Sequence, residues 1–208
     1  MGVLNKIICV YREQGFGKLI RKILSSIKAR VFVIAYVYKL DLDNFSFTLP
    51  DYTGFSFAEM TMEDLDRMHS IYGSEFGKGS YENLKPKLAD PLCRGYLVKN
   101  ENGDICGYGF MRYKGSKPSC EIKYVNLNEN GYLSRDRIFK KYRGKGLQQY
   151  LIYNRLQILI NQNYKTATTY ITRANYASKH SCEKLGFKKC LKIIHLRPID
   201  RKYFKVIK

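Results

Sequence analysis

The sequence predicts an α+β fold, in which one sheet carries helices on its faces. Its 208 residues, 45% hydrophobic and 26% charged, have the size and composition of one globular domain with a small appendage. Several strand patterns follow one another in the middle of the chain, as in antiparallel hairpins. Towards the end, strand and helix patterns alternate, so we expect these helices to cover the sheet that the strands form.

The first 50 residues are predicted to form an N-terminal extension (1–50) of a main domain that covers residues 51–208. Between Phe16 and Ile27, apolar residues recur at helical spacing and basic residues occupy the opposite face, which predicts a basic amphipathic helix. Such a helix either docks on the protein's own core or lies on a membrane surface or a partner. The β-branched and aromatic segment Val31–Leu40 predicts a strand, and its apolar run is far shorter than the roughly 20 residues that cross a bilayer.

The main domain is predicted to begin with a strand, a helix and a hairpin. Phe55–Met60 alternates like a strand, and Thr61 with the acidic residues after it is a typical helix N-terminus. Gly95–Lys99 and Ile105–Tyr113 predict paired strands, because the polar segment Asn100–Asp104 between them has the composition of a turn.

The rest of the domain is predicted to alternate between strands and helices, with Asn-Gly or Gly residues at the turns. We expect strands at Cys120–Leu127 and Tyr132–Phe139, a helix at Leu147–Ile160, a strand at Thr168–Thr172, a helix at Asn175–Leu185, and strands at Phe187–Leu196 and Tyr203–Ile207.

The composition indicates a basic protein of a reducing compartment. Thirty-seven Lys and Arg against 18 Asp and Glu leave a net charge of +19, which favours polyanions such as nucleic acid, anionic lipid or phosphorylated small molecules. The six cysteines show no CxxC pair and no short framework, and no signal peptide precedes them. We therefore expect reduced thiols in a cytoplasmic protein, and no metal. The predicted N-terminal helix also allows peripheral association with a membrane surface.

The segment that carries most chemical information is Arg143-Gly144-Lys145-Gly146-Leu147-Gln148, between a predicted strand and a strong predicted helix. Two closely spaced glycines let the backbone approach a ligand, and the free N–H groups of the helix's first turn point at an anion such as a pyrophosphate. The segment matches neither the P-loop nor the dinucleotide-binding glycine pattern. Taken alone, it is also compatible with an ordinary tight loop.

A second segment, Asn175 to Phe187, follows at a distance that leaves room for one helix and one strand. It contains Ser178 and the run Cys182-Glu183-Lys184-Leu185-Gly186-Phe187. Together the two segments resemble the GNAT superfamily of acyl-CoA-dependent N-acyltransferases, whose acyl-CoA loop is written [QR]xxGx[GA] and whose later helix often ends in Tyr-Glu-Lys-x-Gly-Phe. The resemblance covers approximately Gly54 to Ile194.

The resemblance implies a mixed, mostly antiparallel sheet that is splayed at the acyl-CoA site, and acetyl-CoA as co-substrate. It places the cofactor pyrophosphate on the backbone of Arg143, Gly144, Lys145, Gly146, Leu147 and Gln148. The pantetheine arm is expected to run beside Ile138, Phe139 and Lys140 like an added strand, with Asn175 and Ser178 on the other side.

Two residues depart from the family pattern. Gln148 replaces a Gly or Ala, which implies a displaced helix start or an outward side chain, and weakened cofactor binding. Cys182 stands where many relatives have a Tyr that protonates the departing thiolate. A thiol with a pKa near 8.5 is a different acid, and the alternative is a small buried residue on the inner face of the helix.

The general base is less clear from the sequence. Asp136, in the strand that leads to the loop, is the first candidate, and Glu121 is the second. The alternative for Asp136 is an ordinary surface ion pair with the flanking Arg135 and Arg137. Deprotonating a lysine at pH 7 costs about 4.6 kcal/mol, against about 1.1 kcal/mol for an amine with a pKa near 7.8. The absence of an obvious base therefore favours a weakly basic acceptor.

These features predict an acetyl-CoA-dependent N-acetyltransferase in which an amine attacks the thioester directly. The acceptor is expected to be a small amine-bearing metabolite, such as a nucleotide-linked amino sugar, and no specific nucleic acid partner is expected. The alternatives are a peptide or protein N-acetyltransferase, or a catalytically impaired module that binds CoA, RNA or a membrane. The three histidines show no metal-binding spacing, although His180 lies within the second motif, where it could approach CoA.

Overall fold

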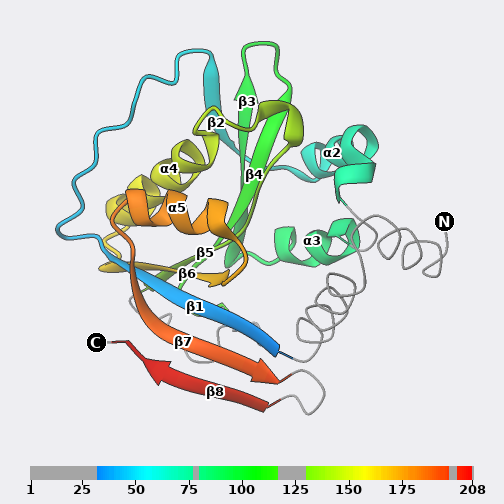
Figure 1. Ribbon diagram of the computed structural model, residues 1–208. Helices are drawn as coiled ribbons and strands as arrows, with labels where there is room; N and C mark the ends of the chain where they lie inside the picture. The colour runs from blue at the N-terminus through cyan, green and yellow to red at the C-terminus, as the bar shows by residue number, and fades with distance from the viewer. Residues whose placement is uncertain (1–31, 77–79, 117–129, 197–200, 208) are drawn as a thin grey trace, which may run out of the picture.

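One eight-stranded sheet runs through the described residues of the computed structural model, which are 32–76, 80–116, 130–196 and 201–207. Its strand order is β2-β3-β4-β5-β6-β1-β7-β8 (Figure 1). The strands are β1 (Phe32–Asp41), β2 (Phe55–Glu59), β3 (Cys93–Asn100), β4 (Ile105–Arg112), β5 (Asn130–Ile138), β6 (Thr166–Thr172), β7 (Lys188–Leu196) and β8 (Arg201–Val206). Every neighbouring pair is antiparallel except β5 and β6, which are parallel.

Helices cover both faces of this sheet, as the α+β prediction requires. α4 (Leu147–Asn161) and α5 (Tyr176–Lys184) lie on one face, and α2 (Met62–Phe76) and α3 (Ser80–Leu88) lie on the other (Figure 1). All residues of β4 are buried, as expected for a central strand that is covered on both sides. The sequence did not predict α3, which contains Pro86 and has a weak apolar pattern.

The strand predicted at residues 31–40 is an interior strand of the sheet. β1 pairs with β6 on one side and with β7 on the other, so part of the predicted N-terminal extension completes the sheet of the main domain. The division of the chain at residue 50 stays a prediction. Three predictions concern residues outside the described part of the chain. They are the amphipathic helix from Phe16 to Ile27, the strand Cys120–Leu127 and the candidate base Glu121.

The sheet splits between β5 and β6, which confirms the predicted splay. The two parallel strands pair only from Asn130 with Thr166 to Leu133 with Thr169, and then separate. On its other edge β5 remains paired with β4 as far as Ile138. The second half of β5 therefore has one edge without a neighbouring strand, and its backbone N–H and C=O groups there can pair with a ligand.

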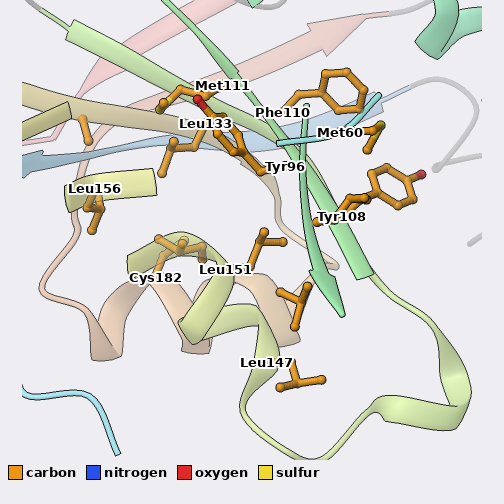
Figure 2. Close-up of a cluster of buried hydrophobic side chains, with 14 of the residues drawn as sticks. Met60, Tyr96, Tyr108, Phe110, Met111, Leu133, Leu147, Leu151, Leu156 and Cys182 are labelled. Atoms are coloured by element: carbon orange, nitrogen blue, oxygen red, sulfur yellow. The ribbon is translucent and has the colours of Figure 1, made fainter. Parts of the chain in front are cut away.

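The helices next to the split pack on the sheet through an apolar cluster. Three leucines of α4 face four side chains of the sheet, and Cys182 of α5 lies beside them (Figure 2). The leucines are Leu147, Leu151 and Leu156, and the sheet residues are Tyr96, Phe110, Met111 and Leu133. Because this cluster is buried, both helices have a fixed position relative to the split. No helix in the described part of the chain is both long and apolar enough to cross a membrane.

Candidate active site

The loop predicted to bind an anion joins the end of β5 to the start of α4. After a 3-10 turn (Lys140–Tyr142), the chain passes through Gly144 and Gly146, whose φ angles of 81° and 71° are left-handed and favour glycine. Gly146 is the N-cap of α4. Within the described part of the chain, the N–H groups of Leu147 and Gln148 have no acceptor, so they are available to an anion.

This loop, here called the anion loop (residues 143–148), opens into a cavity of about 520 Å³ between the end of β5 and the start of α5. The cavity is lined by Asp136, Arg137, Ile138, Tyr142, Arg143, Gly144, Gly146, Leu147, Gln148, Asn175, Ala177, Ser178, His180 and Ser181. A second cavity of about 210 Å³ lies at the split between β5 and β6 and shares Asp136, Gln148, Asn175 and Ser178 with the first. The two motifs that the sequence analysis combined therefore meet at one site.

Comparison with known proteins agrees with this geometry. The model of a family described as the acetyltransferase (GNAT) family matches residues 58–187, more than half of the chain. The chain belongs to the GNAT family of acetyltransferases. No curated protein matches the sequence significantly.

Solved structures share the GNAT fold at low sequence identity. A Drosophila protein is 16% identical with a TM-score of 0.58, over 92% of this chain and 58% of its own. A GCN5-related N-acetyltransferase from Sphaerobacter thermophilus is 12% identical with a TM-score of 0.58, over 92% of this chain and 57% of its own. A fungal GCN5-related glucosamine N-acetyltransferase region, part of a multi-domain β-N-acetylglucosaminidase, is 10% identical with a TM-score of 0.57, over 83% of this chain and 22% of its own. This chain thus spans less than two thirds of the length of all three.

Gln148, the departure from the GNAT loop pattern, points towards α5. Its Nε2 donates a hydrogen bond to Ser178 Oγ at 3.0 Å, and Ser181 Oγ donates to its Oε1 at 3.2 Å. The expected outward side chain is therefore wrong, and α4 begins directly before this residue, at Leu147. The glutamine fits because two serines of α5 satisfy both ends of its amide. Through these two hydrogen bonds, the Gln148 side chain links α4 to α5 at a place where it lines both cavities.

Asn175 and Ser178 lie at the start of α5, facing the anion loop. Asn175 is the N-cap of α5, and its Oδ1 accepts a hydrogen bond from the Ser178 N–H at 3.2 Å. Both residues line both cavities, which is the place that the GNAT resemblance implied. His180 lines only the larger cavity, and the side chains of Lys140 and Lys145 are exposed.

Ile138, Phe139 and Lys140 were predicted to accompany the pantetheine arm. In this GNAT structure, Ile138 O accepts from Arg143 Nε at 3.0 Å, and Lys140 N donates to the Glu75 carboxylate at 3.1 Å. Both partners are flexible side chains, which a cofactor can displace. Phe139 is fully buried, packs on Tyr72 with its ring centroid 3.8 Å away, and lines neither cavity. Its N–H donates to Cys106 O at 3.0 Å and its C=O accepts from Tyr142 N at 2.9 Å, so the structure does not leave its backbone groups free.

Asp136 is brought to the site by a bulge in β5. Two residues of β5, Arg135 and Asp136, lie opposite the single residue Gly109 of β4, and Arg135 has a left-handed φ of 60°. A Cβ atom on Gly109 would lie 2.6 Å from Asp136 Oδ1. The glycine therefore provides the space that the carboxylate occupies, and Asp136 lines both cavities.

The ion-pair partner of Asp136 is Arg155 of α4, not a flanking arginine. Arg155 Nη2 donates to Asp136 Oδ2 at 2.8 Å, and the guanidinium also donates to Phe110 O and Leu151 O. Burial raises the pKa of the Asp136 carboxyl, while Arg155 opposes that increase. Among the described residues, Asp136 Oδ1 has no hydrogen-bond partner and is itself buried, while 14% of the side chain as a whole is exposed where it lines the cavities.

Cys182 faces the core of the protein from α5. Its side chain belongs to the apolar cluster below the site and lines the smaller cavity (Figure 2). Burial raises the pKa of the Cys182 thiol well above its ordinary value, so the thiol stays protonated and is a weak acid.

Sequence reasoning missed two residues that shape this site, Arg155 and Gly109. Arg155 is fully buried, although it is charged. One signal was present: Arg155 lies four positions after Leu151 and four before Leu159, and thus on the apolar stripe of α4. For Gly109 no such signal existed, because its role depends on side chains from β5 and α4.

Proposed function

We propose that this GNAT protein transfers the acetyl group of acetyl-CoA to the amine of a small metabolite. One observation carries the proposal: the anion loop, the unpaired edge of β5 and the Asp136 carboxylate line adjoining cavities. Acyl transfer from a phosphorylated thioester requires a site for the phosphates, backbone groups that hold the pantetheine arm, and a proton acceptor. The three features provide these in that order.

The diphosphate of acetyl-CoA binds at the anion loop. The N–H groups of Leu147 and Gln148 point at it, and the Arg143 and Lys145 side chains add positive charge nearby. The pantetheine arm continues along residues 134–138 of β5, where β6 has separated and backbone groups are available. Asn175 and Ser178 form the opposite wall.

The reaction is a direct attack of the amine on the thioester. The amine nitrogen bonds to the acetyl carbonyl carbon, the C–S bond breaks, and the sulfur leaves as the thiolate of CoA. The Asp136 carboxylate, part of which is exposed to the cavities, accepts the proton that the nitrogen loses, and Arg155 holds its Oδ2 atom. Cys182 remains the candidate donor of a proton to the thiolate, although its raised pKa makes that transfer unfavourable.

The acceptor is a weakly basic amine on an anionic molecule, such as a nucleotide-linked amino sugar. The ordinary pKa of an aspartate lies far below that of a lysine amine, and Arg155 opposes the increase that burial causes, so this base suits an amine that is already partly neutral near pH 7. A third cavity, of about 230 Å³, also reaches Asp136 and is lined by Arg135 and Arg137. These two guanidinium groups provide positive charge for a phosphate or carboxylate beside the reacting amine.

The protein is further proposed to act in the cytoplasm, with the helix that the sequence predicts from Phe16 to Ile27 at a membrane surface. The support is the sequence pattern of that helix and the four described cysteines, all of which are free thiols.

A thermal-shift titration with acetyl-CoA, followed by a thiol-release screen of acceptors, tests the proposed function. At a hundredfold its dissociation constant, a ligand stabilises the folded protein by about 2.7 kcal/mol. Acetyl-CoA should raise the melting temperature, and amino sugars or their nucleotide conjugates should release CoA faster than polyamines or lysine peptides.

Two other outcomes separate the alternatives. Faster thiol release with lysine peptides indicates a protein acetyltransferase. No shift at millimolar acetyl-CoA, together with salt-sensitive binding to RNA or to anionic vesicles, indicates a binding module and contradicts the proposed function.

A further inference from the structure

The long connection between β1 and β2 runs along α4 and reaches the anion loop. Residues 42–54, here called the strap, pass on the outer side of α4 and α5 (Figure 1). The rings of Phe45 and Phe47 lie 5.9 and 6.4 Å from the ring of Tyr153 of α4. The ring of Tyr52 lies 4.8 Å from that of Tyr150, one helical turn nearer to the loop. The strap is thus held on α4 by aromatic contacts.

Tyr52 also makes a polar contact with the anion loop itself. Its hydroxyl donates a hydrogen bond to Gly146 O at 3.1 Å. The same carbonyl accepts the first helical hydrogen bonds of α4, from Gln149 N at 2.8 Å and from Tyr150 N at 3.3 Å. Burial raises the pKa of the Tyr52 hydroxyl, so it keeps its proton and donates at neutral pH.

The carbonyl of Gly146 belongs to the same peptide unit as the N–H of Leu147. Because a trans peptide unit is planar, its C=O and N–H groups point in opposite directions. A donor on the Gly146 carbonyl therefore fixes the direction of the Leu147 N–H, which has no acceptor among the described residues. It also polarises the peptide unit, which strengthens that N–H as a donor.

We propose that Tyr52 is a positioning residue for the cofactor, which acts through the Gly146–Leu147 peptide unit to aim an N–H group at the diphosphate. The proposal rests on the proposed function, since it assumes that acetyl-CoA is the ligand of the anion loop. It adds a residue from the strap, far from both motifs in the sequence, to the cofactor site. Tyr52 touches no part of the cofactor in this role.

The contact also imposes a second requirement for glycine at position 146. A Cβ atom there would lie 2.6 Å from the Tyr52 hydroxyl oxygen but 3.5 Å from the ring carbon that bears it. The first distance is a clash, and the second is an ordinary van der Waals contact. Removing the hydroxyl therefore relieves the steric conflict, although the strain from the left-handed φ of 71° remains.

The first experiment measures CoA affinity and steady-state kinetics for Tyr52→Phe, which keeps the ring and removes only the hydroxyl. The dissociation constant for CoA and the KM for acetyl-CoA should each rise about two- to tenfold, as for the loss of one hydrogen bond, while kcat stays within about twofold. Tyr153→Phe is the matched control, because Tyr153 contacts the strap through its ring, and its values should equal those of the wild type.

The outcomes distinguish this inference from the proposed function. If the wild type binds CoA and Tyr52→Phe binds it equally well, the positioning role is overturned and the proposed function stands. If the wild type does not bind CoA, both are overturned. An equal rise in KM for Tyr153→Phe also overturns the role of the hydroxyl, because it would show a general loosening of the strap.

The second experiment combines Tyr52→Phe with Gly146→Ala. The loss of CoA affinity caused by Gly146→Ala should be smaller in the Tyr52→Phe background than in the wild type, because the 2.6 Å contact is then absent. Thermal unfolding of all four proteins checks that each is folded at the assay temperature. Equal losses in the two backgrounds overturn the assigned contact.

Discussion

Asp136 is subject to two opposing electrostatic influences. Its burial favours the neutral carboxylic acid, and its pairing with Arg155 favours the carboxylate. Because burial dominates, its pKa lies above the ordinary value for an aspartate, and it can exchange a proton with a ligand nearer to neutral pH. Because Oδ1 is buried, that exchange requires the ligand to reach the 14% of the side chain that is exposed.

Asp136→Asn should lower kcat/KM by about a hundredfold or more, as expected for the loss of a general base. The loss should be largest at pH values where Asp136 is ionised and most of the acceptor amine is still protonated. It should shrink as the pH rises towards the acceptor's own pKa, because free amine then becomes abundant. The measurement is a pH profile at a temperature well below unfolding, because the variant leaves Arg155 without its partner. A profile with the wild-type shape contradicts the assignment.

The folded state itself should also depend on the protonation of Asp136. A carboxyl whose pKa is raised by folding binds more protons in the native than in the unfolded state. Its contribution to the free energy of unfolding is therefore fully present below its unfolded pKa and is lost as the pH rises through its folded pKa.

Cys182→Ala tests whether the thiol acts in catalysis or in packing. Because Cys182 is part of the buried cluster, the variant should lower the free energy of unfolding by about 1 kcal/mol and leave kcat within about twofold. Denaturant unfolding and steady-state rates measure the two effects. Cys190→Ala is the control, because that thiol lies on β7 outside the three cavities around Asp136. A tenfold fall in kcat with unchanged stability would instead identify Cys182 as the proton donor.

At the scale of elements, the site depends on where strands and helices end. β5 and β6 separate after four paired residues each, and α4 begins where the anion loop turns through two left-handed glycines. The separation produces a free backbone edge, and the helix start produces free N–H groups. Both features are properties of the backbone, so the proposed cofactor site requires few particular side chains.

Gly146→Val should weaken CoA binding at least tenfold. A β-branched residue is strained at a φ of 71°, and its Cβ would clash with the Tyr52 hydroxyl at 2.6 Å. Calorimetric titration of CoA measures the loss. Gly73→Ala in α2 is the matched control, because no atom lies within 4 Å of the added Cβ and its affinity should be unchanged. Wild-type affinity in Gly146→Val would show that CoA does not use the anion loop.

At the scale of the whole molecule, the net charge of +19 creates a positive field that attracts phosphorylated ligands. Part of this field acts over distance and is screened by salt, since the Debye length falls from about 10 Å at 0.1 M to about 3 Å at 1 M ionic strength. The local N–H groups of the anion loop act at contact and are screened less.

The KM for acetyl-CoA should therefore rise about three- to tenfold between roughly 0.1 and 1 M NaCl, with a smaller change in kcat. Acetyl-pantetheine, a thioester without phosphates, is the control substrate, and its kcat/KM should change little. Steady-state kinetics at several salt concentrations measure both. An equal salt dependence for the two thioesters would show that the charge acts on the acceptor or on the protein's stability instead.

Local signals were sufficient to predict most elements and the anion loop. Hydrophobic periodicity found β1, β2, α2, the β3–β4 hairpin, α4, α5 and the last strands, because each pattern repeats within one short segment. It missed α3, whose apolar pattern is weak, and it placed β1 in a separate extension. Strand order is a long-range property, so no pattern within residues 31–40 could show that β1 lies between β6 and β7.

The amino-acid sequence by itself determined the chemistry of the cofactor end. Glycines at 144 and 146 directly before an apolar helix favour a close approach of the backbone to a ligand and free N–H groups in the first helical turn. Only the tertiary structure decided that Asp136 pairs with Arg155, that Gln148 turns towards α5 and that Tyr52 reaches Gly146. The physical reason is that backbone preferences are local, whereas the partner of a side chain depends on which distant segments pack beside it.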